Sequence, residues 1–277
     1  MNIIKQKDVL RVVVSDMHSG SNLALFLGRA WKGKYTTHIP MGIQERIRKQ
    51  FVAFAAEVKQ ARKNKTVELI HDGDAIDGDH HHSGDVCTIN KKEQADIHIE
   101  LMSELQKRIG WQRGDRLYYT AGTPVHVEDD EDYIGTQMNA VMDDSGYTHQ
   151  LLKLDTNGTH SWFVHHGKGA GEGANEGNTL RNWLKAIQLD AMKDQRRIPD
   201  AIYTGHVHNP TYANYVYRQK MDFKMVHGVI LPSWQAKTRY AYMVAPANRN
   251  KIGGVFHDIT ADGHMVMPPR FSILDTE

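Results

Sequence analysis

Four short motifs built from acidic and histidine residues follow apolar segments of this chain. In chain order they are Asp16-Met17-His18, Gly73-Asp74, His165-His166-Gly167 and Gly205-His206-Val207-His208. Carboxylate and imidazole groups bind divalent transition metals. Several such groups delivered from different strand ends are what a two-metal site for hydrolysis requires. The motifs therefore predict a metal centre that activates water.

The apolar segments before the first motifs have the length and composition of buried strands. In the first half of the chain we expect strands at 10–15, 66–70 and 117–120, and helices at 43–63 and 91–109. Alternating strands and helices are typical of parallel βαβ units. A parallel sheet binds its ligands at the carboxyl edge, so the strand order predicts that the motifs meet there.

The second half of the chain is richer in strands. We expect strands at 160–165, 201–204, 212–217, 223–231 and 254–259, with one helix at 177–194. We find no internal repeat and no low-complexity linker. The simplest architecture is a single α/β domain over residues 1–277, with two sheets.

Composition excludes several classes of protein. Lys and Arg total 34 against 33 acidic residues, a formal charge of +1, so binding to DNA through surface charge alone is not indicated. The single cysteine, Cys87, excludes an internal disulfide and a Cys-based zinc site. We see neither a secretory segment nor a membrane span, and therefore expect a cytoplasmic protein with no membrane partner.

Each motif has an ordinary explanation when it is taken alone. Asp16 could cap a turn beside a surface histidine, Gly73-Asp74 could be a simple turn, and His206 and His208 could be two exposed imidazoles. Their order along residues 11–208, however, resembles the calcineurin-like metallophosphoesterase family. That family's pattern is Asp-x-His, Gly-Asp, Gly-Asn-His-acid, His before Gly, and Gly-His-x-His. The resemblance implies two mixed β-sheets packed as a sandwich and flanked by helices, in four layers.

The resemblance also implies a set of metal ligands. Asp16, His18 and His208 would hold one divalent ion, and His166 and His206 the other, with Asp74 bridging the two. We choose His166 over His165 because it directly precedes Gly167, which would place His165 on the opposite face of the strand. The metals implied are two ions of Mn, Fe, Zn or Ni.

The third motif departs from the family pattern, because the chain has Gly122-Thr123-Pro124-Val125-His126 there. Thr123 takes the place of the metal-binding Asn and has a shorter reach, so the second metal should bind more weakly or keep an extra water. We expect His126 to protonate the leaving oxygen or to stabilise charge on the phosphoryl group. The alternative is an ordinary loop histidine. No acid follows His126 directly, and we expect the acidic run 128–132 to form the first turn of a helix.

Two further segments could contribute to the site. Asp77, Asp79 and the run at 80–82 follow Gly-Asp at once, and we expect a solvated histidine-rich loop that could also line the pocket. The glycine-rich segment 167–173 could form a flexible wall of the cleft. It lacks the ending of a nucleotide-binding P-loop.

The expected reaction is hydrolysis of a phosphate ester by a metal-bridging hydroxide. We favour a phosphodiesterase whose partner is a nucleotide or a nucleic acid. The alternatives are a phosphomonoesterase of the same fold and a non-catalytic scaffold. Only one ligand position departs from the family pattern, which favours an enzyme over a scaffold. The sequence carries no signal for an oligomeric state.

Overall fold

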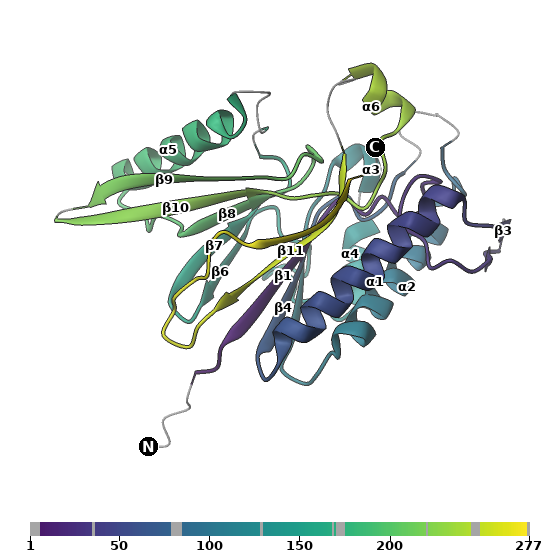
Figure 1. Cartoon of the computed structure of the whole chain (residues 1–277), viewed down its shortest axis with the longest axis horizontal. Coiled ribbons are helices and arrows are strands. Elements are labelled where there is room, and N and C mark those ends of the chain that lie inside the picture. The colour runs from purple at the N-terminus through teal and green to yellow at the C-terminus, as the bar shows by residue number, and fades with distance from the viewer. Residues whose placement is uncertain are drawn as a thin grey trace.

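The computed structural model describes residues 6–34, 37–78, 85–127, 130–167, 169, 175–219, 221–244 and 250–275. Two five-stranded sheets pack face to face, and helices cover the outer face of each sheet (Figure 1). The predicted fold class, two mixed sheets in a sandwich flanked by helices, is confirmed.

The first sheet has the strand order β12-β11-β1-β4-β5. Its strands are β1 (Val9–Val14), β4 (Thr66–Asp72), β5 (Arg116–Thr120), β11 (Lys251–Ile259) and β12 (Arg270–Asp275). β1, β4 and β5 are parallel, as their alternation with helices predicts, whereas β11 and β12 add on in antiparallel fashion. The three parallel strands therefore present their carboxyl ends at one edge.

The second sheet has the order β6-β7-β8-β10-β9. Its strands are β6 (Leu152–Thr156), β7 (Thr159–Phe163), β8 (Ala201–Thr204), β9 (Thr211–Gln219) and β10 (Asp222–Ile230). β7, β8 and β10 are parallel to one another, and β6 and β9 close the two edges in antiparallel fashion. This sheet also delivers three carboxyl ends to one edge.

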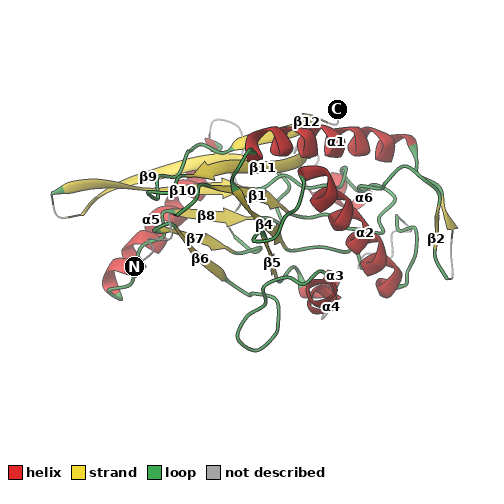
Figure 2. Ribbon diagram, turned by 90° about the horizontal axis from the view of Figure 1, so that it is seen from below, coloured by secondary structure: helices red, strands yellow, loops and turns green. Residues whose placement is uncertain are grey.

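Helices α1 (Gly42–Arg62) and α2 (Lys91–Ile109) lie against the first sheet, and α5 (Asn178–Lys193) lies against the second (Figures 1 and 2). The shorter elements are β2 (Trp31–Lys32), β3 (Thr37–His38), α3 (Pro124–Val127), α4 (Asp130–Gln137) and α6 (Arg239–Val244). No helix in the described ranges is long and apolar enough to span a bilayer.

Strand β1 shows why this sequence forms a central strand. Val12 and Val14 belong to the core beneath α1 and α2, whereas Val13 packs in the core between the two sheets. Because successive side chains point to opposite faces, a strand that is covered on both sides is mostly apolar, and the one charged residue of β1, Arg11, is buried in an ion pair with Glu68. Each of these three valines is 1% exposed or less, so β1 and the motif that follows it are held rigidly.

Candidate metal centre

The residues predicted to bind metal lie just beyond the carboxyl ends of strands from both sheets. Asp16 and His18 follow β1, Asp74 follows β4, and His206 and His208 follow β8. Thr123 and His126 come after β5 and His165 after β7, which adds two more strand ends to the same place. The face-to-face packing of the sheets thus brings together motifs that are as much as 192 residues apart.

The backbone turns sharply at these positions. Among the described residues nine non-glycine residues have positive φ, and five of them are Asp16 (52°), His18 (41°), Asp74 (53°), His206 (69°) and His208 (56°). Such conformations are uncommon for L-residues and cluster where the surrounding structure enforces them for function. Two main-chain bonds hold two of these turns: Asp16 N–H donates to Gly73 O and His18 N–H to Asp74 O, each over 3.0 Å.

Gly205 is needed because the loops approach closely there. A Cβ atom at this position would overlap Ser15 Oγ and would lie 2.7 Å from Asp16 Oδ2. The bare backbone lets the His206 N–H donate to both Asp16 carboxylate oxygens, at 3.1 and 3.0 Å. The glycine of the fourth motif therefore fixes Asp16 against the loop that carries His206 and His208.

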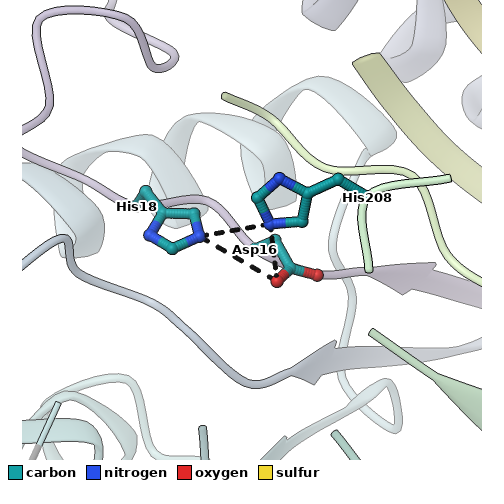
Figure 3. A group of neighbouring side chains, drawn as sticks. All are labelled: Asp16, His18 and His208. Atoms are coloured by element: carbon teal, nitrogen blue, oxygen red, sulfur yellow. Dashed lines mark hydrogen bonds and ion pairs between the residues drawn. The ribbon is translucent and has the colours of Figure 1, made fainter. Parts of the chain in front are cut away.

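One group of potential ligands consists of Asp16, His18 and His208 (Figure 3). His208 Nε2 lies 3.0 Å from Asp16 Oδ1 and 3.3 Å from His18 Nε2. His18 Nε2 lies 3.9 Å from the same Asp16 oxygen. This is the set of residues that the sequence assigned to one metal.

A second group consists of Asp74, His165 and His206, and a third of His18, Asp74 and His126. His165 Nε2 lies 3.1 Å from Asp74 Oδ2. The groups overlap at His18 and Asp74, so Asp74 has the central place expected of a bridging carboxylate.

Thr123 lies against Asp74 from the other side. Its N–H donates to Asp74 Oδ1 over 2.6 Å, and its hydroxyl donates to Asp74 Oδ2 over 3.1 Å. The Thr123 hydroxyl is thus close to the second group of potential ligands, and in this structure it donates its hydrogen bond to Asp74. Whether Thr123 binds metal stays a prediction.

The choice between the adjacent histidines requires a correction. His165 is 1% exposed and faces Asp74, whereas His166 is exposed and belongs to none of the three groups in the described part of the chain. The strand β7 ends at Phe163, before the residue 165 that we expected as its end. The two side chains do lie in opposite surroundings, as we expected, but it is His165 that faces Asp74, so the position directly before Gly167 did not identify the buried histidine. The His166 ring instead packs on that of His206, with centroids 4.6 Å apart.

Hydrogen bonds orient the imidazoles so that Nε2 faces the cluster. His165 Nδ1 lies 2.6 Å from Asp72 O, and His126 Nδ1 lies 2.6 Å from Asp77 O. A carbonyl oxygen can only accept, so Nδ1 carries the proton in both rings. His165 Nε2 is buried beside the Asp74 carboxylate, with which it forms an ion pair but no well-aligned hydrogen bond. A buried nitrogen of this kind, aimed at carboxylates and backed by a carbonyl, fits a divalent metal ion.

The electrostatics of the cluster also suit a cation. Burial would raise the pKa of Asp16 and of Asp74, but the neighbouring imidazoles, among them His165, hold both pKa values well below the usual range. Burial acts to lower the pKa of His165, yet Asp16 and Asp74 outweigh it and raise this pKa to about 10. The carboxylates therefore attract positive charge to Nε2, and a bound divalent ion would displace the proton there.

Two residues support the site in ways that the sequence did not predict. The Asp77 carboxylate lies 3.4 Å from His18 Nδ1, and Gln235 Nε2 donates to the same carboxylate oxygen over 2.8 Å. The spacing of Asp77, three residues after Asp74, was the only available signal, and we interpreted it as part of a solvated loop. Gln235 gave no signal, because its contact crosses 158 residues of sequence. The histidines at 80–82, Asp79 and most of the glycine-rich segment 167–173 lie outside the described residues.

Comparisons with known proteins give only distant similarities. No protein-family model matches the chain, and no curated protein matches it. The NAD nucleotidase of Haemophilus influenzae is similar at 13% identity and a TM-score of 0.39, over 97% of this chain and 51% of that one. A dimetal phosphatase from Danio rerio is similar at 9% identity and a TM-score of 0.43, over 96% and 97%. A metallophosphoesterase from Sphaerobacter thermophilus is similar at 11% identity and a TM-score of 0.31, over 94% and 89%.

The chain thus spans about half the length of the NAD nucleotidase. With TM-scores below 0.5 and identities of 13% or less, these three similarities do not establish a family. The function has to be inferred from the residues of the site.

Proposed function

We propose that this protein is a phosphoesterase that uses two divalent metal ions. The supporting observation is the overlap of three ligand groups at His18 and Asp74, with buried imidazoles whose Nε2 atoms face ionised carboxylates. Bound ions would lower the pKa of a water molecule and neutralise charge on the phosphoryl oxygens. The mixed oxygen and nitrogen donors suit Mn, Fe, Zn or Ni.

The protein's own residues have distinct tasks in this proposal. Asp16, His18 and His208 would hold one ion, and His165 and His206 the other. Asp74 would hold both, since it belongs to the second group and its Oδ2 lies 4.0 Å from His18 Nε2 of the first. We also propose that residues 1–277 act as one catalytic unit, because both sheets supply ligands to the same centre.

His126 is the proposed proton donor to the leaving oxygen. Burial lowers its pKa, and its Nδ1 proton is committed to Asp77 O, so the transferable proton must sit on Nε2. A phosphate bound nearby would favour protonation of Nε2, because a negative charge stabilises the imidazolium. The His126 ring lies 5.1 Å from that of His18, and His126 also belongs to the third group of potential ligands, so it lies directly beside the proposed ions.

The proposed substrate is a phosphodiester in a nucleotide or a nucleic acid. The test is hydrolysis of bis(4-nitrophenyl) phosphate and of 4-nitrophenyl phosphate, each with Mn²⁺, Ni²⁺, Zn²⁺ or Mg²⁺ after removal of bound metal. We expect metal-dependent turnover with the diester faster. Faster monoester turnover would make the protein a phosphomonoesterase, and no turnover with bound metal would favour a scaffold.

A further inference from the structure

Glu131 is a buried acid beneath the proposed metal centre that the catalytic scheme does not use. It lies near the start of α4, and its exposure is 1%. Asp132, the next residue, fixes this end of the helix, because its Oδ1 accepts from both the N–H and the hydroxyl of Thr148. Ile134 anchors the following turn in the main core. The Glu131 side chain is therefore held in place by a packed element.

The Glu131 carboxylate joins two loops. Its Oε1 accepts from Ala75 N–H over 3.1 Å, and its Oε2 accepts from Gly122 N–H over 2.6 Å. Ala75 directly follows Asp74 in the loop after β4, and Gly122 directly precedes Thr123 in the loop after β5. The Glu131 side chain thus binds the main chain next to both Asp74 and Thr123.

The two loops meet closely at this point. Thr123 N–H donates to Asp74 Oδ1 over 2.6 Å, and a Cβ atom on Gly122 would overlap the main chain of Asp74. Two N–H groups that point into one buried space need two acceptor oxygens, and a carboxylate supplies them in one plane. Burial raises the pKa of Glu131 to about 8, while the bonds from Gly122 and Ala75 act against this rise. Each of the two bonds therefore favours the ionised form of the Glu131 carboxyl group over its protonated form.

We propose that Glu131 is a positioning residue, which sets the separation of the Asp74 and Thr123 loops and so the affinity of the metal position formed by Asp74, His165 and His206. This inference rests on the proposed function. It also gives the acidic run after His126 a specific role, since the chain has no acid directly after that histidine.

The proposed effect is selective between the two metal positions. Asp16 and His208 are fixed by the Gly205 loop and by the main chain of the Asp74 loop ahead of Ala75. The Glu131 carboxylate takes no part in those contacts, because its bonds go to the N–H groups of Ala75 and Gly122. Because Asp74 is shared by the two positions, loosening the Glu131 bonds should weaken both, but it should weaken less the position whose other ligands, Asp16 and His208, are held by these contacts.

The test is Mn²⁺ binding to the full chain, measured by equilibrium dialysis of the metal-free protein, for wild type and Glu131→Gln. The glutamine side chain would present an NH₂ group to one of the two N–H donors, so one bond is lost while the shape is kept. We expect the weaker of two Mn²⁺ positions to lose about 10- to 100-fold in affinity, the range found when outer partners of metal ligands are changed. The tighter position should lose clearly less affinity than the weaker one, because Asp16 and His208 are held by other contacts. Diester hydrolysis should fall at low Mn²⁺ and recover at high Mn²⁺.

The matched control is Glu45→Gln on α1, whose carboxylate is 42% exposed and pairs with Arg48. Its Mn²⁺ binding should equal that of wild type. If Glu131→Gln fails to fold, Glu131→Asp keeps the charge but is too short to reach both loops, and it should show the same selective loss.

Unchanged Mn²⁺ binding in the Glu131 variants would overturn the inference, and so would an equal weakening of both positions together with a lowered melting temperature, which indicates a general structural role. A wild-type chain that binds fewer than two Mn²⁺ ions would instead overturn the proposed function. The two failures are therefore distinguishable.

Discussion

The adjacent histidines His165 and His166 offer the sharpest test of the site's geometry, because the structure gives them opposite environments. His165 Nε2 is buried 3.1 Å from Asp74 Oδ2, whereas His166 is exposed and packs its ring against those of His206 and His165. Matched substitutions His165→Gln and His166→Gln change the same chemistry at neighbouring positions. Only the first should remove a metal ligand.

The expected magnitudes follow from these contacts. Changing an outer partner of a metal ligand costs about 10- to 100-fold in affinity, so the loss of a direct ligand should cost at least about 100-fold. This corresponds to about 2.7 kcal/mol, at about 1.4 kcal/mol per tenfold change. A ring contact such as that between His166 and His206 contributes about 0.5–1.5 kcal/mol, so His166→Gln should cost about tenfold or less.

The assay is Mn²⁺ titration of the metal-free variants, followed by diester hydrolysis at a Mn²⁺ concentration that saturates wild type. His165→Gln should bind one Mn²⁺ equivalent at that concentration and lose at least about 99% of turnover. His166→Gln should bind two and keep most of its activity. The reverse pattern, with His166→Gln losing the metal, would refute the assignment of His165 and restore the ligand expected from the sequence.

Three further predictions concern residues on and off the site. Asp74→Asn should abolish diester hydrolysis and leave the circular dichroism spectrum unchanged, because Asp74 is the proposed bridge between the ions; full activity would exclude a bridging role. His126→Ala should lower kcat by about 10²- to 10⁴-fold while two Mn²⁺ equivalents still bind, and loss of metal would instead make His126 a ligand. Burial, with help from Arg11, lowers the pKa of His257 to about 3, below its value of about 6.5 in an unfolded chain. The unfolded state therefore takes up the extra proton as pH falls below about 6.5. Between pH 7 and pH 5, proton uptake by His257 in the unfolded state should lower the free energy of unfolding by about 2 kcal/mol. The free energy of unfolding, measured with urea in EDTA at the two pH values, should therefore fall by that much less in His257→Gln than in wild type. An equal fall in both proteins would contradict the assignment.

The long, well-patterned elements were predictable from the sequence. The apolar spacing of α1 and α2 and the continuous apolar run of β1 each reflect a face that must be buried, so their positions agree with prediction to within about a residue or two. The edge strands β6 and β12 were missed. Each is short and mixes polar with apolar residues, since an edge strand is only partly covered.

The site was predictable as far as its residues sit at strand ends, and no further. Asp16, His18, Asp74, His206 and His208 follow strands that the pattern located, and the sheet then brings them together. Which of the two histidines after β7 faces the site depends on where that strand ends and how the chain turns beyond it. Contacts such as that between His165 Nδ1 and Asp72 O determine this turn. Glu131 and Gln235 act through contacts that cross 56 and 158 residues of sequence, which no local pattern encodes.

The most direct test of the two-metal proposal is anomalous X-ray diffraction at the manganese edge from crystals of the protein grown with Mn²⁺. We predict two peaks about 3.5–4 Å apart, one beside Asp16, His18 and His208 and the other beside His165 and His206, with Asp74 between them. A single peak, or peaks that lie away from Asp74 at saturating Mn²⁺, would contradict it.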